Sequence, residues 1–115
     1  MATKEEKIDE FTNALFLTFD SIALAKKALL ASPSKEDERS LIRLIVALEV
    51  EVADIETRLN DVLDDDTSVK GPTPAQISEV GKLSAKVQQM TNQALQAKAV
   101  VTLVTNVLAL ASKIS

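Results

Sequence analysis

The 115-residue sequence contains no Cys, His, Trp or Tyr, and these absences remove most enzyme chemistry. Without Cys the chain has neither a disulfide nor a thiol nucleophile. Without His it lacks the most common general base, the usual zinc ligand and the Glu-x-x-His pair of helical di-iron centres. We therefore expect a protein that is not an enzyme, with no catalytic residues, no cofactor and no metal site.

Glycine and proline are also scarce, with two and three residues respectively, and aromatic residues make up only 3% of the chain. A protein built from strands needs more turn residues than this to connect them. Apolar residues reach 46%, which excludes a disordered chain and supplies one core of Leu, Ile, Val and Ala. The composition therefore predicts an all-α fold in a single domain over residues 1–115.

The charge balance argues against nucleic acids and membranes as partners. The net charge is −4, and the Lys and Arg residues are dispersed without aromatic neighbours, so we expect no nucleic-acid partner. The first ten residues, MATKEEKIDE, lack the apolar centre of a signal peptide. No apolar segment comfortably reaches the ~20 residues of a membrane-spanning helix. We therefore expect a cytoplasmic protein that does not insert into a membrane.

A first helix is predicted over residues 4–31. Thr3 and Glu6 have the spacing of a capping box at its start, and Pro33 disfavours helical geometry at the residue before it. The apolar residues keep a helical period, which predicts one buried face. They are Ile8, Phe11, Leu15, Phe19, Ile22 and Leu30, and the face is widened by Phe16, Ala23 and Leu29.

A second helix is predicted over residues 35–63, with Ser34 as its N-cap. Its apolar residues alternate in spacings of four and three, which is the seam of a heptad repeat. Because only a short link separates the first two helices, they should form an antiparallel hairpin. The seam consists of Leu41, Ile45, Leu48, Val52, Ile55, Leu59 and Val62.

The segment 64–73 is the one predicted loop, and it begins with three consecutive aspartates. As a calcium-binding loop starting at Asp64, it would have Val69 where Gly is required and Ala75 where Glu is required. The aspartates therefore predict a solvated loop. Thr73, followed by proline, has the pattern of an N-cap for a third helix.

The third helix is predicted to be continuous over residues 74–114, because Gly81 is the only helix-breaking residue after its first turn. Its length exceeds that of the first two helices, so from Leu103 onward it would extend beyond the hairpin. The predicted architecture is an antiparallel three-helix bundle or coiled coil with an extended third helix. The alternative is a four-helix bundle, if the third helix breaks near the polar stretch 88–93 and folds back.

The extension carries two apolar stripes, and soluble proteins rarely leave such a surface uncovered. A second copy of the chain, a foreign partner or a fold-back could cover it. We expect a non-enzymatic helical protein–protein interaction module that forms a homo-oligomer through its apolar C-terminal helix. The second function left open is a small acidic antagonist or chaperone, of the immunity-protein or secretion-chaperone type, that binds another protein. The expected interface residues are Val100, Leu103, Val104, Val107, Leu108, Leu110 and Ile114.

Overall fold

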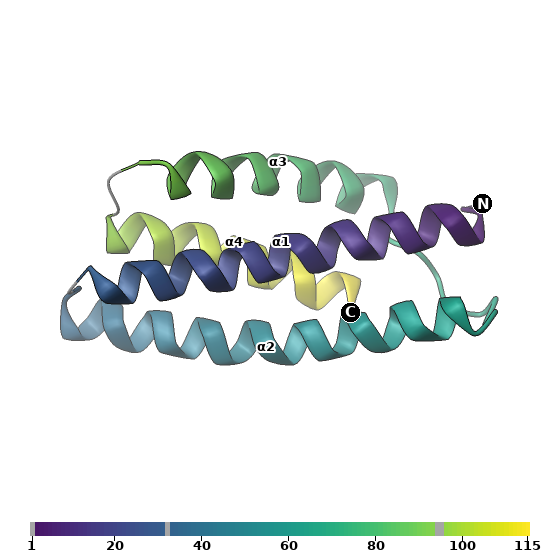
Figure 1. Ribbon diagram of the computed structural model, residues 1–115, viewed down its shortest axis with the longest axis horizontal. Helices are drawn as coiled ribbons and strands as arrows, with labels where there is room; N and C mark the ends of the chain where they lie inside the picture. Colours follow the sequence, from purple (N-terminus) through teal and green to yellow (C-terminus); the bar gives the residue numbers. More distant parts are fainter. Residues whose placement is uncertain (1, 32, 94–95) are drawn as a thin grey trace.

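The computed structural model describes residues 2–31, 33–93 and 96–115, and this part of the chain forms four helices and no strand (Figure 1). The all-α fold predicted from the composition is therefore confirmed. The helices are α1 (Lys4–Leu30), α2 (Lys35–Leu63), α3 (Pro74–Thr91) and α4 (Ala97–Ile114).

The starts of α1 and α2 are fixed by the local capping groups that the sequence indicated. The hydroxyl of Thr3 accepts a hydrogen bond from the backbone N–H of Glu6 at 3.1 Å. The hydroxyl of Ser34 does the same for the N–H of Asp37 at 3.2 Å. Each of these bonds satisfies a backbone donor that has no partner inside the helix. Both helices lie within one residue of their predicted ranges at each end.

The end of α2 is closed by the aspartate segment that follows it. Asp65 has a φ of +64°, in the left-handed region that a helix C-terminus often uses. This bend lets the N–H of Asp66 donate to the carbonyl of Asp61 at 2.9 Å, while the N–H of Asp65 donates to Val62 at 3.0 Å. Lys4 of α1 pairs with the Asp65 carboxylate at 2.6 Å. The aspartates therefore terminate the helix and tie its end to the start of α1.

The expectation of one continuous helix over residues 74–114 is wrong. The structure has two helices there: α3 ends at Thr91 and α4 begins at Ala97. Asn92 caps α3 without a glycine or a proline, and its N–H donates to the carbonyls of Gln89 and Met90. The end of α3 lies inside the polar stretch named in the alternative prediction, although positions 94 and 95 fall outside the described residues.

Two physical effects favour ending α3 at this point. Lys27 of α1 donates to the carbonyl of Thr91 at 2.9 Å, which places a cation at the negative end of the α3 dipole. In addition, the fold-back buries the apolar residues of α4 that a continuous helix would expose, at ~1.5–3 kcal/mol for each large side chain. This gain exceeds the cost of one more pair of helix ends, where a few backbone groups must find new partners.

The helices run in alternating directions, so that α1 and α3 point one way and α2 and α4 the other (Figure 1). Helix α4 contacts all three others, and α1 also contacts α2 and α3. Over the described residues, α2 and α3 do not touch, so they lie on opposite sides of the α1–α4 pair. The molecule is elongated, with extents of 46 × 22 × 17 Å.

The core runs along the centre of this arrangement and draws on all four helices. Helix α3 contributes least, with only three buried residues, Val80, Leu83 and Val87. One side of α3 is therefore free to line an open surface together with α1. The largest fully buried apolar side chains are Phe11, Leu24, Leu41, Leu48, Ile55, Val87, Val100, Val104 and Val107.

Candidate partner-binding groove

The residues expected to form an oligomer interface lie in the interior of the chain itself. Six of the seven are buried, and only Leu108 is partly exposed. The sequence predicts a partner at these residues because a continuous third helix extends beyond the hairpin. Since α4 folds back against α1, α2 and α3, these residues are already covered. The six buried residues are Val100, Leu103, Val104, Val107, Leu110 and Ile114.

Helix α4 is also the one described helix that is long and apolar enough to cross a membrane by length and composition. Its mean hydropathy is 1.5 over 18 residues, and core helices of water-soluble proteins can reach the same value. In this structure its most apolar side chains face the other three helices. The apolar character of α4 is thus accounted for by the core.

A groove runs between α1 and α3, and none of the residues that line it comes from α4, which packs against both helices. Its first section is a hollow of about 570 Å³. Leu17 of α1 and Val80 of α3 form its floor, and both are buried. The α1 wall carries Glu10, Asn13, Phe16 and Asp20, and the α3 wall carries Ile77, Gly81, Ser84 and Gln88.

The apolar part of the groove wall is exposed to an unusual degree. Phe16 is 57% exposed and Ile77 is 39% exposed, although the chain has only three Phe residues. Single exposed apolar residues are common on protein surfaces, but apolar residues grouped around a hollow are typical of binding sites. The grouping of Phe16 with Ile77 at one hollow therefore marks the groove as the candidate site.

Gly81 leaves the α3 wall of the groove without a side chain at its position. It lies in the interior of a helix, where glycine costs about 0.5–1 kcal/mol relative to alanine. Nothing lies within 4 Å of the position that a Cβ atom would occupy, so no packing contact inside the chain requires glycine. The missing side chain leaves the backbone of α3 open to close approach by another molecule.

The α1 wall carries two carboxylates, Glu10 and Asp20, that form no ion pair within the described part of the chain. One carboxylate oxygen of Glu10, Oε2, is buried and has no hydrogen-bond partner among the described residues. Burial first, and then the nearby charges of Glu6 and Asp9, raise the pKa of the Glu10 carboxyl above its ordinary value of 4.5. The Glu10 side chain as a whole is only partly buried and lines the groove, so a cationic group placed there would pair with the carboxylate and lower its pKa.

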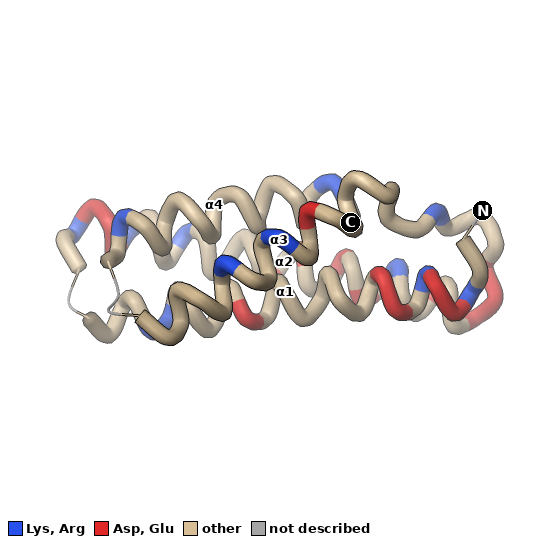
Figure 2. The backbone as a smooth tube through the Cα atoms, turned by 90° about the horizontal axis from the view of Figure 1, so that it is seen from above, with Lys and Arg blue, Asp and Glu red and all other residues tan. Residues whose placement is uncertain are grey.

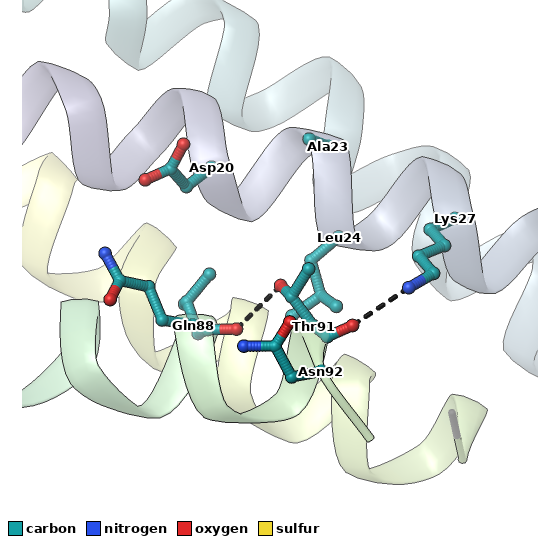
Figure 3. A pocket seen from close by; sticks show the side chains of 8 residues that line it. Asp20, Ala23, Leu24, Lys27, Gln88, Thr91 and Asn92 are labelled. Carbon is teal, nitrogen blue, oxygen red and sulfur yellow. Dashed lines mark hydrogen bonds between the residues drawn. The ribbon is translucent and has the colours of Figure 1, made fainter. Parts of the chain in front are cut away.

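The groove continues toward the far end of α3 as a second hollow of about 440 Å³ (Figure 3). Asp20 and Gln88 belong to both sections and stand on opposite walls, as Figure 3 shows. At the far end the hydrogen bond from Lys27 to the carbonyl of Thr91 joins the two walls. The groove is thus acidic along α1 and closed by a lysine where α3 ends.

The charges of the whole molecule are also unevenly distributed along its length. Acidic residues gather at the end of the molecule that carries the N-terminus, where α1 begins and α2 ends (Figure 2). Two of the loop aspartates there have structural partners. Asp65 pairs with Lys4, and Asp66 accepts hydrogen bonds from the N–H and the hydroxyl of Ser68, which lower the pKa of its carboxyl. No group of three or more acidic side chains that could hold a metal ion occurs in the described part of the chain.

Sequence reasoning missed this groove because it placed Phe16 on the widened core face of the first helix. The spacing alone could not have shown this, because Phe19 and Leu30 belong to the predicted core series and are nevertheless 44% and 87% exposed. In the sequence pattern, Gly81 indicates only a weak helix breaker. Its position opposite α1 depends on how α3 packs, which no local pattern reveals.

Comparisons of the chain with protein-family models, with curated proteins and with solved structures gave no significant match.

Proposed function

We propose that this protein is a non-enzymatic helical binding module that holds an amphipathic helix of a partner protein in the α1–α3 groove, on a four-helix bundle. The observation that carries the proposal is the pairing of an exposed Phe16 with a wall opened by Gly81 in one hollow. An amphipathic helix fits such a groove because its apolar stripe can cover the exposed ring while its backbone approaches the glycine.

The charges of the groove define the chemistry of the partner. Glu10 and Asp20 lie on the α1 wall, and the residues of the α3 wall are uncharged. A partner helix with Leu or Ile along one stripe would pack against Phe16, and Arg or Lys beside that stripe would pair with the carboxylates. Hydrogen bonds to a charged group contribute more than those between neutral groups, roughly 1.5–3 kcal/mol each, so a basic residue at Glu10 should add affinity.

This proposal develops the second function expected from the sequence, that of a small acidic protein that binds another protein. A homo-oligomer formed through the C-terminal helix would instead require α4 to leave the core. That step would expose residues such as Val104 and Val107, which are fully buried. The groove requires no such opening.

The proposal can be tested by titrating ¹⁵N-labelled protein with a set of amphipathic helical peptides that carry Leu and Arg at varied spacing. Matched peptides with Glu in place of Arg serve as controls. We expect micromolar binding of basic peptides, with chemical-shift changes along α1 and α3. Equal binding of the acidic peptides, or no saturable binding by any basic peptide at ~1 mM, would contradict the proposal.

Two variants with a matched control locate the binding surface. Gly81→Leu should fill the groove and weaken peptide binding at least tenfold, about 1.4 kcal/mol. Ala85→Leu adds the same side chain to an exposed position one turn later that does not line the groove, so it should bind normally. Phe16→Ala should lose affinity but keep the fold, because its ring is largely exposed. If Gly81→Leu binds as well as Ala85→Leu, the groove is not the site.

A further inference from the structure

The outward face of α2 carries a second apolar surface, independent of the α1–α3 groove. Ile42, Val46 and Val50 are 47%, 60% and 55% exposed. They recur every four residues, so they form one ridge along the helix, on the side opposite the buried seam. Since α2 contacts only α1 and α4 among the described helices, no part of the described chain covers this ridge.

The ridge has the properties of a self-complementary interface. Its members are β-branched and therefore rigid at χ1, so they lose little side-chain entropy on burial. A row of exposed apolar residues can stay in contact with an identical row over several turns when two helices cross at a shallow angle of about 20°. Ala53, which is exposed and follows Val50 by three residues, extends the surface by one turn.

We propose that this face binds a second copy of the chain, with the two α2 helices antiparallel about a twofold axis near residue 48. In this register Val46 packs against Val50 of the second copy. Ile42 packs against Ala53, and Arg43 reaches the Asp54 carboxylate. Each of these contacts occurs twice, as twofold symmetry requires.

The positions of the charged residues select the antiparallel direction. Arg39 lies seven residues before Val46, on the same side of the helix, and it is exposed. In a parallel pair the two copies of Arg39 would face each other, and like charges at this position would oppose association. In the antiparallel pair Arg39 lies opposite Thr57, which is uncharged, so this repulsion is avoided.

One residue limits the strength of the dimer. Glu49 is exposed and lies close to the proposed axis, so the two copies of its carboxylate approach each other. The apolar ridge is also short compared with the roughly 800 Å² that each partner contributes to a standard interface. We therefore expect a dissociation constant on the order of 100 µM, and a lower one for Glu49→Gln.

Sedimentation velocity between about 10 µM and 1 mM tests the dimer directly. The full chain should shift from monomer to dimer, and Val46→Glu should remain monomeric with an unchanged helical circular dichroism spectrum. Arg43→Asp should weaken the dimer roughly tenfold, and Arg43→Asp combined with Asp54→Arg should restore it. A chain that is monomeric at 1 mM, or a dimer that tolerates Val46→Glu, would overturn the proposal.

Disulfide trapping tests the direction of pairing, because the chain has no cysteine of its own. Val46→Cys and Val50→Cys chains mixed in a glutathione redox buffer should form mainly the mixed 46–50 disulfide. Ala85→Cys on α3, in place of Val50→Cys, should form no mixed product above the random level. Dominant 46–46 and 50–50 products would refute the antiparallel arrangement. The peptide titration reports on the α1–α3 groove, whereas disulfide trapping reports on the outward face of α2. Failure of one proposal can therefore be distinguished from failure of the other.

Discussion

Replacing Gly81 with Ala should make the protein more stable, and the size of the gain can be worked out from the structure. Gly81 lies inside α3 with an ordinary negative φ, and a Cβ atom at this position meets nothing within 4 Å. The substitution therefore introduces no clash and no new contact. What remains is the reduced freedom of the unfolded chain and the better helix propensity, which together add about 0.5–1 kcal/mol. For a chain of this size that raises the melting temperature by roughly 2–4 °C.

Gly71 provides the matched control, because its surroundings differ while its backbone is also unstrained. A Cβ atom there would lie 3.1 Å from Oε2 of Glu10 and 3.1 Å from Cγ of Lys7. Both side chains would have to move by a few tenths of an ångström. The same entropic gain is then offset by crowding beside a carboxylate that already lacks a hydrogen-bond partner. Gly71→Ala should therefore gain clearly less than Gly81→Ala, or lose stability.

The assay is urea unfolding followed by circular dichroism at 222 nm, with the midpoint and the slope determined separately. The reasoning is refuted if Gly81→Ala lowers the free energy of unfolding, since the open space beside Gly81 would then be absent. It is also refuted if Gly71→Ala gains as much as Gly81→Ala. In the peptide titration, Gly81→Ala should bind more weakly despite its greater stability. Such a trade-off is expected where a helix retains glycine for contact with a partner.

Three further predictions concern the core, the end of α3 and the groove carboxylate. Leu103→Glu buries a charge in the core and should abolish cooperative thermal unfolding; a folded Leu103→Glu chain would show that α4 does not pack inside. Lys27→Ala removes the hydrogen bond to Thr91 and should cost roughly 0.5–1 kcal/mol in urea unfolding, with Lys27→Arg as the milder control. Because the pKa of Glu10 is raised on folding, its stabilising contribution is present below pH 4.5 and is lost as the pH rises through the folded-state pKa. Glu10→Gln should flatten that part of the stability–pH curve, and an unchanged curve would contradict the assignment.

The features that could be predicted from the sequence are those that depend on no contact with a distant part of the chain. The capping box at the start of α3 is an example, since Thr73 and Gln76 exchange hydrogen bonds of 2.9 and 3.1 Å. Both partners are three residues apart, so their meeting depends on no distant contact. The heptad seam of α2 is similar, because a regular apolar period fixes the buried face whatever covers it.

The end of α3 could not be predicted in this way. Asn92 terminates the helix without the left-handed glycine that usually signals such an end. The group that completes the end is Lys27, which is 64 residues away in sequence. A local pattern contains neither that cation nor the burial gained when α4 folds back. The break is therefore a tertiary effect on a sequence that would otherwise continue as a helix.

The two apolar stripes of the C-terminal segment show that this helix must be covered on more than one side. They do not show which helices cover it. A helix with two stripes must be covered from more than one direction, and α4 indeed contacts three helices. A second chain could have covered the same stripes if the helix had continued past residue 91. Because α3 ends there, the helices of the chain itself cover them. Once α4 occupies the centre, α3 can only lie at the edge, where it buries three residues and leaves Gly81 and Ser84 beside α1. The fold-back that removed the expected interface on α4 is thus what creates the groove between α1 and α3.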